Sequence, residues 1–264
     1  MSGEHALSPN WIAWMRDYAA AARRFVAEDP IRVSSEEERE LVAIKMALYA
    51  RALTLFEGAL LLLENDRQLD FRIQSRGVIE ATMYLIALDR NPTFVARMKD
   101  DDFKSRQSRA ALHLGARKFN GTEDVRQQLE EFVAHGPQGA KAIQLGTLLE
   151  GSDFDRLYGS YRDISGDAAH VSLTALNRHY VENPMNHSAS LIIDPALDEI
   201  DFLVTVTDLG ISMTIATLLA MRIKEKTDVW DEFQVLLSQY RTLTRDGHGS
   251  PEIPISQENG PSQQ

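Results

Sequence analysis

Apolar residues recur every three to four positions along most of this chain, and turn residues interrupt the pattern at helix-length intervals. Such spacing places the apolar side chains on one face of an α-helix. The sequence therefore predicts an all-α fold, a single helical bundle of about seven to eight helices. The expected helices include 9–29, 35–65 and 67–90, and a brief helix over 138–150.

Capping residues mark where several of these helices begin. The segment "SSEEERE" contains a capping box in which Ser35 precedes Glu38 by three residues. Asp194 followed by Pro195 predicts the start of another long helix, because proline fits the first helical position. Ser152 predicts the start of the helix that carries the motif discussed below.

One segment departs from the helical pattern. The residues "RHYVENPMNHSASLII", 178–193, form two short runs of β-favouring residues around a turn-rich "ENPMN". They predict a small β-hairpin that protrudes from the helices or braces them. Beyond this, 245–264 is rich in Gly, Pro, Ser and Gln, so we expect a disordered tail there and a single domain over 1–244.

The composition is that of an ordinary globular protein, with 44% hydrophobic and 25% charged residues. The chain contains no cysteine, which excludes disulfides, thiolate catalysis and cysteine-bound metals. A net charge of -11 repels nucleic acid unless basic residues are locally concentrated. The one basic-leaning stretch, 97–118, is interrupted by aspartates and is typical of a solvated helix face.

The sequence also carries signals about compartment. The N-terminus lacks a basic segment followed by an apolar core, which is the pattern of a secretory signal. The apolar run over 209–221 is shorter than the roughly 20 residues needed to cross a bilayer, and it fits a buried core helix. We therefore expect a cytoplasmic protein with no membrane partner.

Two charged residues interrupt the apolar stripe of the helix expected over 67–90. Leu69, Ile73 and Met83 define that stripe, and Arg76 and Glu80 fall in its middle. Their spacing of four lets the two side chains meet on the helix surface. Because buried charges are costly unless paired, we expect a buried ion pair that either holds helices together or forms a polar site.

The fragment "YRDISGDAAH", 161–170, combines several candidate site residues. Tyr161 and Ile164 lie at the helical spacing of a buried face. A second face is formed by Asp163, Asp167 and His170. Arg162 precedes His170 by eight residues, which places the two about 80° apart on an unbroken helix. The fragment is either a catalytic face or the solvent-facing side of a helix.

Metal and nucleotide chemistry find little support in the sequence. Asp167 and His170 have the spacing of a carboxylate–histidine metal pair, but a di-metal bundle needs a second copy, and the sequence has none. The phosphate-binding loop, the dinucleotide fingerprint, the zinc-protease motif and the nucleophile elbow are also missing. We therefore expect neither a metal nor another cofactor.

Two segments resemble a known bacterial family. "RGVIEATMYLIAL", with Arg76 and Glu80, and "YGSYRDISGDAAHVS" are similar to domain-of-unknown-function family 5677. That family pairs an R-x-x-x-E helix with a later helix reading roughly Tyr…Ser…His-x-Ser, and the resemblance covers about 42–176. In this chain the residues that correspond to the pattern of the later helix are Tyr161, Ser165, His170 and Ser172.

The family's all-α bundle is similar to the HEPN group. Many members of that group are metal-independent ribonucleases of toxin–antitoxin and phage-defence systems. They carry an arginine, usually followed by a polar residue, then four to six residues and a histidine. This chain has Arg162, Asp163 and His170, with seven residues between the arginine and the histidine. The resemblance implies an endoribonuclease that acts on RNA as a homodimer with its two motifs facing each other.

Two functions follow from these observations. In the nuclease, His170 is expected to act as general base or acid on a ribose 2′-hydroxyl, and Arg162 to stabilise charge on the phosphate. The rival is a non-catalytic binding or sensing module with a polar network of Arg76, Glu80 and His170 that meets a ligand or a protein partner. We expect those three side chains to converge on one site in either case. The other binding candidates are Tyr161, Ser165 and Asp167.

Overall fold

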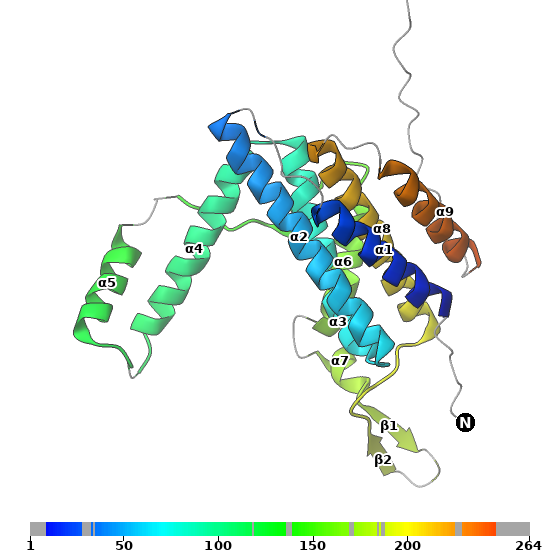
Figure 1. Cartoon of the computed structure of the whole chain (residues 1–264). Helices are drawn as coiled ribbons and strands as arrows, with labels where there is room; N and C mark the ends of the chain where they lie inside the picture. Colours follow the sequence, from blue (N-terminus) through cyan, green and yellow to red (C-terminus); the bar gives the residue numbers. More distant parts are fainter. Residues whose placement is uncertain are drawn as a thin grey trace, which may run out of the picture.

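The computed structural model describes residues 9–27, 33, 35–117, 119–135, 139–168, 172–183, 185, 188–224 and 229–246. Within these ranges the chain forms nine α-helices, one 3-10 turn (η1, Leu145–Thr147) and a two-stranded sheet (Figure 1). The helices are α1 (Pro9–Ala27), α2 (Glu36–Glu64), α3 (Gln68–Arg90), α4 (Phe94–Leu114), α5 (Glu123–Ala134), α6 (Arg156–Ala168), α7 (Leu173–Asn177), α8 (Glu199–Lys224) and α9 (Trp230–Asp246). The strands are β1 (Tyr180–Asn183) and β2 (Ser188–Leu191).

The expected all-α fold with one small hairpin is confirmed, and the described residues contain nine helices instead of seven to eight. The additional helix arises in the motif region, where two helices replace one. The prediction of a brief helix over 138–150 is wrong, because only η1 forms there. Gly139 and Gly151 have positive φ angles of 90° and 70°, which glycine adopts at low cost and which interrupt a helix at both ends of that stretch.

The capping prediction is confirmed at α2 and wrong at α8. The Ser35 side chain accepts a hydrogen bond from the backbone N–H of Glu38 at 3.1 Å, so α2 begins as its capping box predicts. α8 begins at Glu199, several residues after Pro195. The reason is that the Asp198 carboxylate accepts a hydrogen bond from the N–H of Asp201 at 2.8 Å and thereby caps the helix.

The C-terminal prediction falls mostly beyond the described part of the chain. α9 continues to Asp246, two residues past the expected end of the domain at 244. The rest of the tail expected over 245–264 lies outside the described residues.

Five helices, α1, α2, α3, α8 and α9, enclose the main hydrophobic core. Its centre is aromatic, because the rings of Tyr18, Phe56 and Tyr240 lie 5.1 to 6.3 Å from the ring of Trp14. The Trp14 indole N–H donates to a backbone carbonyl of α9 at 2.8 Å, and the Tyr18 hydroxyl donates to Thr217 of α8 at 2.9 Å. These hydrogen bonds fasten the first described helix to the last two.

α8 is apolar around most of its circumference because α1, α2, α3, α6 and α9 all contact it. By length and apolar composition alone, α2 and α8 would each be able to cross a membrane, a test that buried core helices also pass. The most apolar window of α8 is 67% buried inside the protein. This burial fits the core helix that the sequence predicts over 209–221.

A second hydrophobic cluster seats α6 against α3 and α8. Tyr161 and Ile164 of α6 are buried there, as the sequence predicts, together with Ile79 and Met83 of α3. Ile215 contributes from α8. Because apolar side chains fix one face of α6, its polar residues point in defined directions.

α4 and α5 form a helical hairpin that projects away from the bundle (Figure 1). Phe94 is buried at the base of α4, whereas no residue of α5 is buried. Farther out the two helices hold each other, because Phe103 packs on Phe132 with ring centroids 5.0 Å apart. The described arginines and lysines of the basic-leaning stretch are exposed along this projection, which confirms a solvated face.

β1 and β2 pair antiparallel, with Tyr180 opposite Leu191 and Glu182 opposite Ala189. The hairpin extends beyond α7 and the start of α8 (Figure 1), so the protruding arm is the correct alternative. Every residue of β2 is exposed.

Gly210 of α8 lies where α8, α9 and α1 approach closely. A β-carbon at this position would lie 2.6 Å from the Tyr240 ring and 3.2 Å from the Trp14 ring. Gly210→Ala should therefore lower the free energy of unfolding by about 1–3 kcal/mol, because buried rings must shift. Gly159→Ala is the matched control in α6, since a β-carbon added there would meet nothing within 4 Å.

Gly159→Ala should raise the free energy of unfolding by about 0.5–1 kcal/mol through helix propensity alone. Urea denaturation of both variants measures the difference. Equal changes for the two substitutions would contradict the close approach at Gly210.

Candidate functional site

The motif region forms two helices joined by a serine cap. α6 ends at Ala168 and α7 begins after Ser172, whose hydroxyl accepts a hydrogen bond from the Ala175 N–H at 3.0 Å. The same hydroxyl donates to the Gly166 carbonyl at 3.0 Å and ties the two helices together. The continuous helix predicted through this region is wrong, because the serine starts a new helix.

His170 lies in the junction between α6 and α7, outside the described residues. Its angle to Arg162 and its approach to Glu80 therefore remain predictions. Arg162 and Asp163 are both exposed on α6. Asp163 and Asp167 do not share an environment as predicted, since the Asp167 side chain is only 3% exposed.

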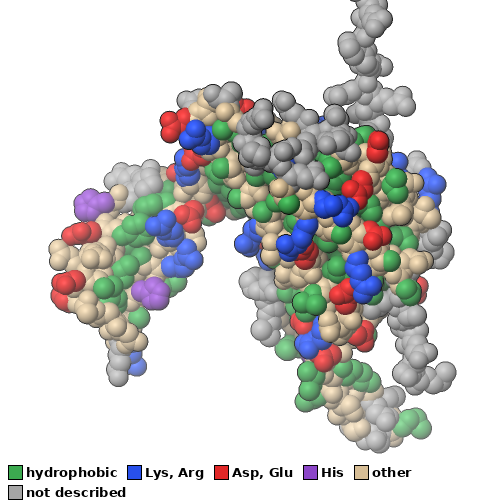
Figure 2. Space-filling view, viewed as in Figure 1, with side chains coloured by type: hydrophobic (Ala, Val, Ile, Leu, Met, Phe, Trp, Pro, Cys, Tyr) green, Lys and Arg blue, Asp and Glu red, His purple; other side chains and the backbone are tan. Residues whose placement is uncertain are grey.

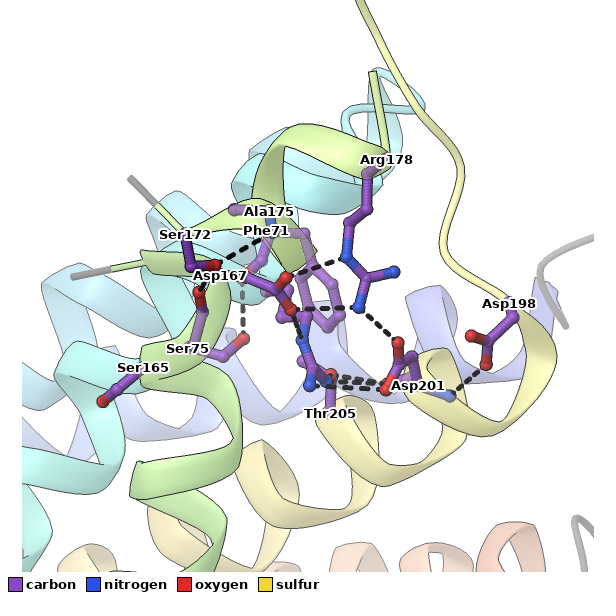
Figure 3. A network of polar contacts seen from close by, with 12 residues as sticks. Phe71, Ser75, Ser165, Asp167, Ser172, Ala175, Arg178, Asp198, Asp201 and Thr205 are labelled. Atoms are coloured by element: carbon purple, nitrogen blue, oxygen red, sulfur yellow. Dashed lines mark hydrogen bonds and ion pairs between the residues drawn. The ribbon is translucent and has the colours of Figure 1, made fainter. Parts of the chain in front are cut away.

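Four charged residues form a closed, largely buried group where α3, α6, α7 and α8 meet (Figure 3). We call Arg72, Asp167, Arg178 and Asp201 the charge ring. Asp167 receives Arg72 Nε at 2.7 Å and Arg178 Nε at 2.8 Å, on separate carboxylate oxygens. Asp201 receives Arg178 Nη2 at 2.5 Å and lies 3.3 Å from Arg72 Nη2.

Because the charge ring is largely buried, each of its charges needs a partner within the ring. The side chains of Arg72 and Asp167 are 4% and 3% exposed, so each has lost nearly all contact with water. Two positive and two negative charges cancel, and Arg72 also donates to the Thr205 hydroxyl at 2.6 Å. Such a group is tolerated inside a protein only when every charge is paired and hydrogen-bonded.

The electrostatics of Arg178 follow from the same contacts. Burial acts to lower the pKa of its guanidinium, but hydrogen bonds and charge interactions with Asp167 and Asp201 outweigh burial and raise the pKa above its ordinary value. Arg178 therefore stays charged. Both carboxylate oxygens of Asp167 accept hydrogen bonds from arginines, so Asp167 is a structural residue.

A second polar cluster lies on the opposite side of α6, around Arg76. Arg76 Nε donates to the Ser165 hydroxyl at 2.9 Å, and its Nη2 donates to the Tyr161 hydroxyl. The guanidinium also lies over the Tyr161 ring, 4.5 Å from the centroid. Glu80 is 3.7 Å from Arg76 Nη1. The structure thus brings four of the predicted site residues together.

The predicted burial of the Arg76–Glu80 pair is wrong. The two side chains are 27% and 36% exposed, and Ile73 of the supposed core stripe is also exposed. The buried face of α3 is rotated toward Arg72 and Ser75, so the arginine that the core encloses is the one a turn earlier. Glu80→Ala should consequently cost under about 1 kcal/mol, as for a solvated ion pair.

Asp208 of α8 is a candidate that the sequence did not reveal. Burial raises the pKa of its carboxyl, a hydrogen bond with Ser160 opposes that rise, and the charge of Asp163 adds to it. The polar edge of α6 therefore faces a partly desolvated carboxyl on α8. No local motif marks Asp208, because its neighbours come from another helix.

Sequence reasoning also missed Arg72, Arg178 and Asp201. Their partners lie far apart in the chain, so no local spacing identifies them. One usable signal was present: Arg72 stands four residues before Arg76 on the same helix, at a position equally compatible with the core face.

The fold and these two clusters describe an all-α protein whose central helices meet around buried charges. The chain belongs to the family of unknown function DUF5677, which matches residues 42–188. That range extends from α2 to the first residue of β2 and includes both polar clusters except Asp201 and Thr205. Neither the curated proteins nor the solved structures contain a match to this chain.

Removing one carboxylate from the charge ring should be severely destabilising. Asp167→Asn removes the charge that two buried guanidinium groups share, and we expect a loss of about 3–5 kcal/mol in the free energy of unfolding. Asp102→Asn is the matched control, because Asp102 pairs with Arg106 on α4 with side chains 64% and 58% exposed. That control should change stability by under about 0.5 kcal/mol. Similar losses in both variants would refute a buried ring.

Asp208 should make the protein less stable as pH rises. A carboxyl with a raised folded-state pKa binds its proton more tightly in the folded protein, so stability falls from about pH 4, the unfolded pKa, up to the raised value. Asp208→Asn should raise the melting temperature at pH 7 and leave it nearly unchanged at about pH 3, where the native carboxyl is protonated. Melting curves across pH test this, and a lower melting temperature at pH 7 would contradict it.

Proposed function

We propose that this protein is a HEPN-like, metal-independent endoribonuclease of a toxin or phage-defence system. The observation that carries the proposal is the presentation of Arg162 and Asp163 on the exposed side of α6, ahead of the junction that contains His170. The resemblance assigns these residues to the nuclease motif. An exposed arginine is accessible to a substrate as large as RNA.

The surroundings of α6 support this assignment. Its apolar face is buried against α3 and α8, Arg76 holds Tyr161 and Ser165, and the charge ring holds Asp167 at its end. Catalytic groups act best when a rigid scaffold fixes them, because little reorganisation is then needed in the transition state. The motif helix is held in this way on every face except the one with Arg162.

The proposed reaction is transesterification within RNA. The ribose 2′-oxygen bonds to phosphorus as its proton passes to a general base, and the bond from phosphorus to the 5′-oxygen breaks as that oxygen receives a proton. The products are a 2′,3′-cyclic phosphate and a 5′-hydroxyl. His170 serves as base or acid, since imidazole titrates near neutral pH, and Arg162 offsets the charge that develops on the phosphate.

The proposal includes a homodimer in which each copy contributes one motif to a composite site. Two copies of His170 then divide the roles of base and acid. The substrate is intracellular RNA, so the protein acts in the cytoplasm.

A second function is favoured by the Arg76 cluster. The Arg76 guanidinium is oriented by Tyr161 and Ser165 while 27% of its side chain remains exposed. This arrangement suits a site that binds an anionic ligand without chemistry. The net charge of -11 also fits a protein that does not bind long nucleic acids.

RNA cleavage without metal ions separates the two functions. The purified chain should cut single-stranded or transfer RNA in EDTA and leave 2′,3′-cyclic phosphate ends. His170→Ala should reduce the rate by about 10²–10⁴-fold, the usual contribution of a general acid or base. Arg162→Ala should reduce it by about 10²–10³-fold.

The matched control for this assay is His113→Ala, which alters an exposed histidine on α4 and should retain full activity. Circular dichroism verifies that each variant is folded. If the unaltered chain leaves RNA intact, or if His170→Ala cuts at the original rate, the nuclease is excluded and the binding module becomes the better assignment.

A further inference from the structure

Exposed apolar side chains concentrate on one small part of the molecule. Of the sixteen large hydrophobic residues that the described chain leaves exposed, eight lie between residues 173 and 200. Leu191 and Ile193 are 87% and 85% exposed, and Val181 is 56% exposed. Figure 2 shows such side chains over the protruding hairpin. Apolar surface concentrated in this way usually marks a site of association.

The hairpin also lacks sheet partners. In the described residues β1 and β2 pair with each other and no third strand joins them. A two-stranded sheet is marginal in water unless further strands or a helix cover it. A further strand would cover the apolar side chains and would also pair with an open strand edge.

β2 is short, but it carries no charged residue and no proline that would protect its edge. Natural edges are blocked by charged residues, proline or bulges. The stretch from Met185 to Ile193 contains no Asp, Glu, Lys, Arg or Pro, in a chain whose net charge is -11. β1 differs, because it contains Glu182. The edge of β2 is thus the one that is suited to pairing.

We infer that the β2 edge, with Leu191 and Ile193, is the docking surface for a second copy of this chain. An antiparallel strand pairs with its own copy about a two-fold axis, because the same residues then meet in both directions. Two copies of so acidic a protein repel each other over most of their surface, and this uncharged segment lets them approach at the lowest electrostatic cost.

The composition of the segment discriminates against other occupants. An anionic membrane surface requires free lysines or arginines beside the apolar residues. The arginine nearest to the hairpin, Arg178, is engaged by Asp167 and Asp201. A basic peptide would require carboxylates on the strand that it joins, and β2 has none.

The base of the hairpin is held by the charge ring, which limits the conformational freedom that pairing must remove. Arg178 of the charge ring lies two residues before β1, and His179 continues the ladder by accepting the N–H of Ile192 at 2.8 Å. A preorganised edge loses little conformational freedom when it gains a partner. The inference rests on the proposed homodimer and names the surface through which the two copies associate. Its test measures mass and not RNA cleavage, so either proposal can fail while the other holds.

The first experiment compares two surface leucines by light scattering. The unaltered chain should have twice the monomer mass of 29.7 kDa. Leu191→Glu should raise the dimer dissociation constant by at least about tenfold, because it places like charges across the axis. Leu112→Glu, at a leucine on α4 that is 72% exposed, should leave the dimer intact. Both sites are exposed, so neither substitution should disturb folding.

The second experiment uses the absence of cysteine in this chain. Single cysteines placed at Ser188, Ala189, Ser190 and Leu191 in turn should form an intermolecular disulfide under mild oxidation at one or two positions near the axis. Ser108→Cys on α4 should not crosslink. Both experiments use the full chain with no added ligand.

Three outcomes would overturn the inference. The unaltered chain could remain monomeric up to about 100 µM, a concentration at which even a weak specific dimer is populated. Leu191→Glu and Leu112→Glu could yield the same mass. Finally, a monomeric chain could sediment with anionic lipid vesicles in a manner that Leu191→Glu abolishes, in which case the surface belongs to a membrane.

Discussion

The burial of four charges where α3, α6, α7 and α8 meet is the constraint on which the rest of the site depends. An arginine or carboxylate removed from water loses several kcal/mol of solvation, and only complete pairing offsets that loss. Arg72 and Asp167 are almost fully enclosed, and Arg178 and Asp201 close the group. A partly formed ring is unfavourable, so the four elements adopt one mutual arrangement or lose the ring altogether.

This constraint acts together with the Arg76 cluster to orient α6. Asp167 secures the C-terminal end of the helix from one side, while Tyr161 and Ser165 receive Arg76 from another. Buried apolar residues occupy the remaining inner face. The face with Arg162 is the one left toward solvent. In the proposed nuclease, a large substrate would therefore meet a helix whose position is determined before binding, which is what electrostatic catalysis requires.

The sequence predicted the features that depend on local chemistry. The Ser35 cap, the buried face of α6 and the hairpin each follow from spacing within a few residues. The charge ring could not be found in this way, because Arg72 and Asp167 are 95 residues apart. The expected core stripe of α3 included Ile73, which is exposed, and left out Arg72, which is buried, and this is why Arg76 and Glu80 were expected to be buried. Asp198 replaced Asp194 as the cap of α8 for a comparable reason, since two aspartates compete and tertiary packing selects one.

The hairpin connects the charge ring to the proposed docking surface. Arg178 lies two residues before β1, and the chain that leaves β2 continues to α8, whose first turn carries Asp201. A second copy that pairs with β2, as proposed, would act on a hairpin whose base is held by the contacts of Arg178 with Asp167 and Asp201. Asp167 lies in the last turn of α6, so these contacts link the base of the hairpin to that helix. A shift of the hairpin on pairing therefore has to break the ion pair of a buried aspartate of α6 or carry that aspartate with it, and breaking it is costly.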